Sequence, residues 1–361
     1  MSTHPTLQAP VNPQLESKFF SAPLEIRQEI YGYLIPYGVH AYLRQGKLYL
    51  SACVESCANG GLFGAERRES SDWRASDPVW QRRLRSSWGP HWKCEEVALR
   101  MNHNCEAVSD TDMAMLRACR RKYMDIVNFT VDMAAVHVTD LDTLDYLLQR
   151  AQKASSETST VSEYLATVVP HVQNLSIVLR LPLTICKVLE SANDHCSSTS
   201  SLTNATAWLR LCPAIAGLKR LQRLHIWLDH DDKSSWSVVN ERAILSPLNE
   251  LTSISSLNIS VNLPKLHPRY ETPESHFMRE CPTPPFAIER RLRQRHHAVD
   301  VGEGQFVVRY QVDFPYLYDL SDYEDMSEDE AEEMERTMWK NGVDVKAEVG
   351  KIVGGLDAVA P

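Results

Sequence analysis

The first strong pattern of apolar positions lies near the amino end of the chain. Within Phe19–Pro36 the apolar side chains recur at the spacing of one helical face: Ile26, Ile30, Tyr33 and Leu34. Pro23 suits the first turn of a helix, and Pro36 ends it. The pattern predicts a helix of about three turns, which is too short to be stable unless its apolar stripe packs on something.

After this helix the apolar positions alternate with the two-residue period of β-strands. Val39–Leu43 and Lys47–Leu50 flank Arg44-Gln45-Gly46, where glycine supplies the positive φ of a tight turn, so a β-hairpin is expected. From Ser51 to Asp110 the pattern dissolves, and we expect a long insertion anchored by Trp73, Trp80, Trp88 and Trp92.

The middle of the chain repeats one pattern three times: apolar, two spacers, apolar, then alternation. It occurs in Val172–Leu179, Leu218–Leu228 and Ile254–Val261, with helical stretches expected near 183–191, 203–216 and 240–251. The pattern resembles the strand segment of a leucine-rich repeat. Spacings of 49 residues from Leu175 to Leu224 and 33 from Leu224 to Leu257 are irregular. We therefore predict an α/β fold with an irregular leucine-rich-repeat-like array of strands and helices.

Charge is concentrated at one end of the chain. The 361 residues carry 38 Lys and Arg against 47 Asp and Glu, a net charge of −9, and Tyr316–Glu335 alone holds ten acids and no base. The remainder sums to +1, from −9 plus 10, which gives no electrostatic case for nucleic acid. The tail is expected to be acidic and largely disordered, with a transient helix at Met326–Trp339.

The segments that the sequence lacks favour a location inside the cell. No window resembles a membrane helix, and the first residues lack the layout of a secretory signal. Nine cysteines, an odd number without an export signal, are expected to be reduced thiols. We expect a cytoplasmic or nuclear protein with no membrane contact.

No catalytic signature and no cofactor motif is present, so no catalytic residue is predicted. The sequence predicts no metal site either. The weak candidates for one are His91, Cys94, His103 and Cys105, which supply two nitrogens and two sulfurs at a spacing that matches no usual zinc knuckle. Cys53 and Cys57 are weaker candidates still for metal ligands.

Two polar clusters are also open to more than one interpretation. Asp229-His230-Asp231-Asp232 could hold a cation, and a solvated turn is the preferred alternative. The basic cluster Arg290–His297 could contact phosphate, and a solvated helical face or contact with the chain's own acidic tail is preferred.

Two blocks carry a resemblance to a known family. Pro23-Leu24-Glu25-Ile26-Arg27 with Ile30, Tyr31, Tyr33 and Leu34, and then Leu116-Arg117-Ala118-Cys119-Arg120 with Tyr123, resemble an uncharacterised fungal family with an F-box-like amino-terminal module. Trp88–Glu96 also looks like a signature of such a group. In F-box proteins the two blocks lie on helices of one small bundle. The resemblance implies that Leu24, Ile26, Ile30, Tyr33 and Leu34 would divide between the core of the bundle and a groove contact with a Skp-type adaptor. The alternative is that the whole stripe packs inside the protein.

These observations predict four segments: an arm at 1–18, an F-box-like module at 19–150 with the insertion 51–110, the repeat-like domain at 161–315, and the tail 316–361. The resemblance implies a non-enzymatic substrate receptor of a cullin-type ubiquitin ligase. A compact F-box closes within about 50 residues, short for a domain, whereas here about 80 separate the two blocks. The alternative is therefore a fungal scaffold with a diverged F-box-like fold that no longer binds the adaptor. Its oligomeric state and its partner or substrate are left open.

Overall fold

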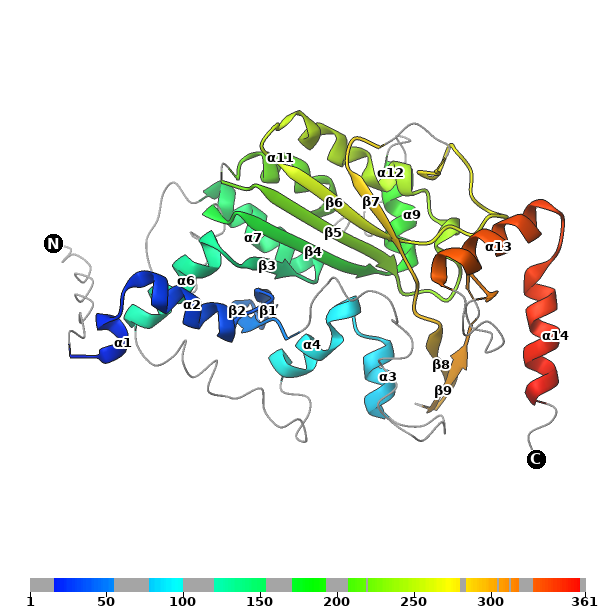
Figure 1. Cartoon of the computed structure of the whole chain (residues 1–361), viewed down its shortest axis with the longest axis horizontal. Helices are drawn as coiled ribbons and strands as arrows, with labels where there is room; N and C mark the ends of the chain where they lie inside the picture. The colour runs from blue at the N-terminus through cyan, green and yellow to red at the C-terminus, as the bar shows by residue number, and fades with distance from the viewer. Residues whose placement is uncertain are drawn as a thin grey trace. The chain divides into compact units, whose positions relative to one another are not determined.

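The structure, a computed structural model, describes residues 16–54, 78–99, 120–153, 171–192, 207–218, 220–279, 284–303, 305–311, 313–317 and 327–357. The chain has a mixed α/β fold, as predicted. A mostly parallel sheet has the strand order β2-β1-β3-β4-β5-β6-β7, and β8 and β9 form a separate pair (Figure 1). The chain divides into a first unit of Met1–Ser56, Lys93–Ile177 and Pro213–Leu224, and a second unit of Cys57–Trp92, Val178–Cys212 and His225–Pro361.

The first unit contains short helices and the amino-terminal strands. In chain order these elements are α1 (Lys18–Ser21), α2 (Leu24–Leu34), β1 (Val39–Arg44), β2 (Lys47–Ala52), most of α4 (Trp92–Leu99), α6 (Arg120–Asp132), β3 (Ala135–Val138), α7 (Leu141–Lys153) and most of α11 (Leu211–Ala216). Strands β4 (Asn174–Leu181) and β5 (Arg223–His230) contribute residues to both units.

The β1–β2 hairpin forms where the sequence predicts it. Gln45 and Gly46 both have positive φ, 51° and 72°, which is the geometry of a two-residue turn that matches the twist of antiparallel strands. Gly38 has φ +106°, and a Cβ there would lie 2.1 Å from the carbonyl oxygen of Ala135. Glycine at 38 therefore lets β1 approach β3, with which it pairs in parallel.

The second unit contains the other strands and helices of the described residues. Its further elements are α3 (Pro78–Leu84), η1 (Gly89–His91), α9 (Leu183–Ala192), η3 (Trp236–Val238), α12 (Glu241–Leu245), η4 (Ser246–Ser253), β6 (Asn258–Pro264), β7 (Ala287–Arg291), β8 (His296–Gly302), β9 (Gln305–Tyr310), α13 (Glu328–Lys340) and α14 (Val345–Asp357). The three repeated segments of the sequence become β4, β5 and β6, which are neighbours in the strand order. Their inward side chains are buried, and β4 is buried along its whole length.

Two segments differ from the sequence expectation. The basic cluster Arg290–His297 lies on strands β7 and β8 and the link between them, and not on a helical face. The acidic tail was expected to be largely disordered, with a transient helix at Met326–Trp339. Its described residues form α13 over most of that predicted helix, and α14 follows. A capping box starts α13, since Ser327 Oγ accepts from the Glu330 amide at 3.3 Å and the Ser327 amide donates to Glu330 Oε2 at 2.9 Å. Apolar side chains then cover the two helices in one small core: Tyr316, Leu317, Ala331, Val345 and Val349. Burial of these groups outweighs the charge of the segment.

Candidate functional site

The residues predicted to bind a partner lie on α2, and three of the five are exposed. The side chains of Leu24, Ile26 and Tyr33 are 49%, 53% and 80% exposed, while Ile30 and Leu34 are half-buried. At about 100° per residue, Ile26, Ile30 and Tyr33 fall within a helical sector of about 60°. We call these three residues the α2 face. Leu24 begins the helix on another side, so the five candidates do not form one stripe.

The opposite side of α2 is anchored on α6 (Figure 1). The ring of Tyr31 is fully buried, with its centroid 5.8 Å from that of Phe129 on α6. Arg27 forms an ion pair with Asp125 of α6. Helix α6 begins at Arg120, at the end of the second resemblance block, whose Leu116–Cys119 lie outside the described residues. The two blocks that are far apart in sequence thus lead into helices that pack together.

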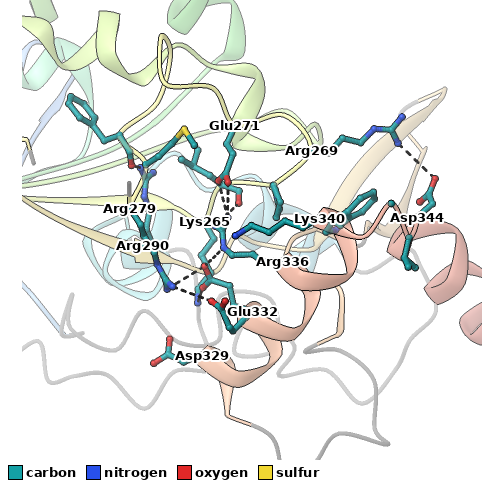
Figure 2. A pocket seen from close by; sticks show the side chains of 18 residues that line it. Lys265, Arg269, Glu271, Arg279, Arg290, Asp329, Glu332, Arg336, Lys340 and Asp344 are labelled. Atoms are coloured by element: carbon teal, nitrogen blue, oxygen red, sulfur yellow. Dashed lines mark hydrogen bonds and ion pairs between the residues drawn. The ribbon is translucent and has the colours of Figure 1, made fainter. Parts of the chain in front are cut away.

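A pocket of about 1000 Å³ lies within the second unit, between α13 and the segment that follows β6. Figure 2 shows its charged side chains facing one another. The lining contains six basic side chains, Lys265, Arg269, Arg279, Arg290, Arg336 and Lys340, and five acidic ones, Glu271, Asp329, Glu332, Glu333 and Asp344. Nearly equal numbers of opposite charges indicate an ion-paired contact between α13 and the rest of the unit.

Glu332 is the centre of this ion-paired contact. Its carboxylate accepts from Lys265 Nζ at 2.7 Å and from Arg336 Nε at 2.9 Å, and Arg336 also bonds both carboxylate oxygens of Glu271, at 2.9 and 3.0 Å. Burial opposes ionisation of Glu332, but the hydrogen bond from Lys265 and the charges of Lys265 and Arg336 lower its pKa overall. The contact therefore holds a charged carboxylate that is only 6% exposed.

Replacing Glu332 by alanine is expected to release α13. The change leaves the ammonium of Lys265, 6% exposed, without its carboxylate, and loss of one partner of a buried ion pair costs about 3 kcal/mol. Amide protection of α13 in hydrogen exchange should fall about 100-fold, at 1.4 kcal/mol per tenfold. Glu333→Ala is the matched control, because Glu333 is 64% exposed and faces an exposed arginine. Equal amide protection of α13 in the two variants would show that the ion pairs of Glu332 do not hold this helix.

The second unit uses its other candidate clusters internally. Arg293 Nε donates to Asp229 Oδ1 at 2.8 Å, and both side chains are buried. Arg293 Nη2 also donates to the carbonyl oxygens of His230 and Asp232, at 3.0 and 3.1 Å. Asp229 and His230 are therefore part of a buried network around Arg293, and the prediction of a solvated turn is wrong for these two residues. Asp231 and Asp232 are exposed, as that prediction requires. Sequence periodicity could not show this pairing, because the partners lie 64 residues apart.

Two of the four weak metal candidates, His91 and Cys94, lie in one buried cluster with His40 and Cys53. His103 and Cys105 lie outside the described residues. His40 is not among the metal candidates that the sequence indicates, and Cys53 is only a low-ranking one. The signal that could have found them is the alternation of the hairpin, which places both on one face of β1–β2.

The helices and the mostly parallel sheet define a mixed α/β protein. Its candidate functional features are the exposed α2 face and the ion-paired contact between α13 and the rest of the second unit. The chain belongs to a family described as a domain of unknown function, DUF7730, whose model matches residues 12–282. No curated protein and no solved structure matches the chain. The matched range ends before β7, so α13 and the pocket residues that it contributes lie outside it. No helix among the described residues is long and apolar enough to span a lipid bilayer.

Proposed function

We propose that this chain is a non-enzymatic protein-interaction module that works in the cytoplasm or nucleus. In this proposal, the α2 face docks a Skp-type adaptor, which makes the chain an F-box-like substrate receptor of a cullin-type ubiquitin ligase. The observation that carries the proposal is the exposure of Ile26 and Tyr33, 53% and 80%, on a helix held from its other side. Large apolar side chains exposed together are typical of contact with a partner.

The anchoring of α2 supports the same proposal. A docking helix must keep its position when its partner is absent, because ordering it on binding would reduce affinity. Tyr31 packs on α6 and Arg27 pairs with Asp125, so α2 is held before any partner binds. The residues of the F-box-like resemblance thus separate into an inward set that holds the helix and an outward set that is free for contact.

The test is recovery of a purified Skp-type adaptor by the full-length chain. Tyr33→Asp and Ile26→Asp should each reduce recovery at least about tenfold, because truncating a central apolar contact costs about 2 kcal/mol or more. Both side chains are exposed, so the fold should survive, and circular dichroism checks this. Tyr270→Asp is the matched control, since Tyr270 is 50% exposed and lies in the second unit.

The scaffold alternative makes a different prediction in the same experiment. If the folded wild-type chain recovers no adaptor, the ligase proposal fails and the chain is a diverged scaffold. The scaffold should then copurify with partners whose amounts do not change when the proteasome is inhibited. Adaptor recovered equally by wild type and both α2 variants would instead show that the α2 face is not the docking surface.

A further inference from the structure

The β1–β2 hairpin places a histidine and a cysteine on one face. Directly opposed residues of an antiparallel pair point to the same side, and so do residues two apart along a strand. His40 is opposite Ser51, so Cys53, two residues further on, lies on the side of His40. The Cys53 amide donates to the Gly38 carbonyl at 2.8 Å, which extends the pairing beyond the end of β2. The two side chains are diagonal neighbours.

Helix α4 covers this face of the hairpin. Tyr42, two residues after His40, donates its hydroxyl to the carbonyl oxygen of Ala98 on α4 at 3.1 Å. One turn earlier on α4, Cys94 Sγ lies 3.8 Å from Cys53 Sγ. The helix therefore brings a second sulfur to the first, far from it in sequence.

The fourth side chain comes from the helical turn that leads into α4. His91 ends η1, and Trp92, with φ −58° and ψ −32°, continues the helical conformation into α4. Residues three apart on a helix share one side, so His91 and Cys94 point the same way. The backbone of a single turn sets their separation.

The four side chains form one buried group. The ligand atoms of His40, Cys53, His91 and Cys94 all lie within 4.8 Å of one another, and each side chain is at most 1% exposed. A tetrahedral zinc ion with Zn–S bonds of about 2.3 Å separates two thiolates by about 3.8 Å. The observed separation of the sulfurs is 3.8 Å. A disulfide would need about 2.05 Å.

We propose that His40, Cys53, His91 and Cys94 bind one zinc ion as a structural site. Two thiolates and two imidazoles complete a tetrahedron, which leaves no open position for a substrate. The Val54 amide donates to Cys94 Sγ at 3.4 Å, and hydrogen bonds of this kind orient a metal ligand. The ion would tie the hairpin to α4, and its binding would contribute to folding of the segments that supply its ligands. This site is independent of adaptor docking.

The first experiment measures zinc in the purified full-length chain by mass spectrometry after dialysis. Wild type should hold one zinc per chain, whereas Cys53→Ala and Cys94→Ala should lose most of it. Cys186→Ala and Cys212→Ala are matched controls, because both cysteines are buried but lie outside the cluster. They should keep the full amount. A wild-type chain without zinc even after zinc is supplied, or equal loss in the controls, overturns the site.

A second experiment separates loss of a ligand from loss of the fold. Cobalt replaces zinc in the refolded chain, and its thiolate charge-transfer absorbance reports the number of sulfur ligands. His91→Cys keeps four ligands and adds a third thiolate at the Cys-x2-Cys spacing that zinc sites use, so the absorbance should rise about 1.5-fold. An unchanged absorbance would exclude His91, and a wild-type spectrum without tetrahedral cobalt bands would exclude the site.

Discussion

Replacing Glu241 by alanine is expected to lower the free energy of unfolding of the second unit by about 3 to 5 kcal/mol. Glu241 is completely buried and accepts four hydrogen bonds. Two come from Arg290, at 2.8 and 2.6 Å, one from Trp236 Nε1 at 2.9 Å, and one from the Phe277 amide at 2.6 Å. Without the carboxylate, these donors lose their acceptor while most of their burial remains, and that penalty is large.

Urea unfolding, followed by tryptophan fluorescence, measures this effect. Glu348→Ala is the control, because Glu348 is 52% exposed and its ion pair with Lys351 lies on the surface of α14. This substitution should change the free energy of unfolding by less than about 1 kcal/mol. Replacing both Glu241 and Arg290 by methionine should recover part of the lost stability, since no unpaired charge is left behind. Similar urea midpoints for Glu241→Ala and Glu348→Ala would show that the buried pair contributes little.

Local patterns predicted much of the fold. The turn at Gln45-Gly46 and the alternation around it are sufficient to predict the hairpin, because a two-residue turn fixes the register of its own strands. The helix at Leu24–Leu34 and the strand at Asn174–Leu181 were predicted for the same reason, from periods that span a few residues. Their physical causes lie within the segments themselves.

Long-range pairing could not be predicted in this way. Apolar spacing in α2 singles out Ile26, Ile30 and Tyr33, yet the side chain buried at its centre is Tyr31, because α6 presents Phe129 to it. The partnership of Cys53 with Cys94 likewise depends on which helix covers the hairpin, and nothing in either segment encodes that choice. Periodicity identifies a face but does not say what the face contacts.

The acidic segment shows the same limit for electrostatics. Ten acids without a base predict disorder when the segment is considered alone. In the structure Glu332 pairs with Lys265, and Glu335 is buried and accepts from the Leu317 amide at 3.1 Å and Trp339 Nε1 at 3.1 Å. Partners from the rest of the second unit and from the segment itself offset the repulsion that the composition implies.

Acidification from pH 7.5 to 5 is expected to destabilise the second unit, because three buried histidines are held neutral. Burial lowers the pKa of His230, His267 and His297 to about 4 each, and an arginine charge is the next largest cause in every case. Their unfolded value is 6.5, so the unfolded chain binds more protons between these limits. The stability is fully present above pH 6.5 and is lost as the pH falls towards 4, by up to about 3 kcal/mol for each histidine.

One carboxyl acts in the opposite direction. Burial raises the pKa of Glu335 from 4.5 to about 6, so its protonation favours the folded state as the pH falls through this range. The shift of Glu335 corresponds to about 2 kcal/mol, which is less than the combined loss from the histidines. The net expectation is therefore destabilisation by acid. Its size is a large part of the free energy of unfolding of a typical protein, about 5 to 15 kcal/mol.

Urea unfolding at pH 7.5, 6 and 5 gives the midpoint and the free energy of unfolding at each pH. The slope of that free energy against pH gives the number of protons taken up on unfolding. His267→Phe keeps a ring beside Tyr316 and Trp339 but cannot titrate, so it should reduce the slope by up to one proton. His171→Gln, at an exposed position, is the control and should leave the slope unchanged. A midpoint that stays constant or rises between pH 7.5 and 5 would mean that these histidines are not kept neutral by burial.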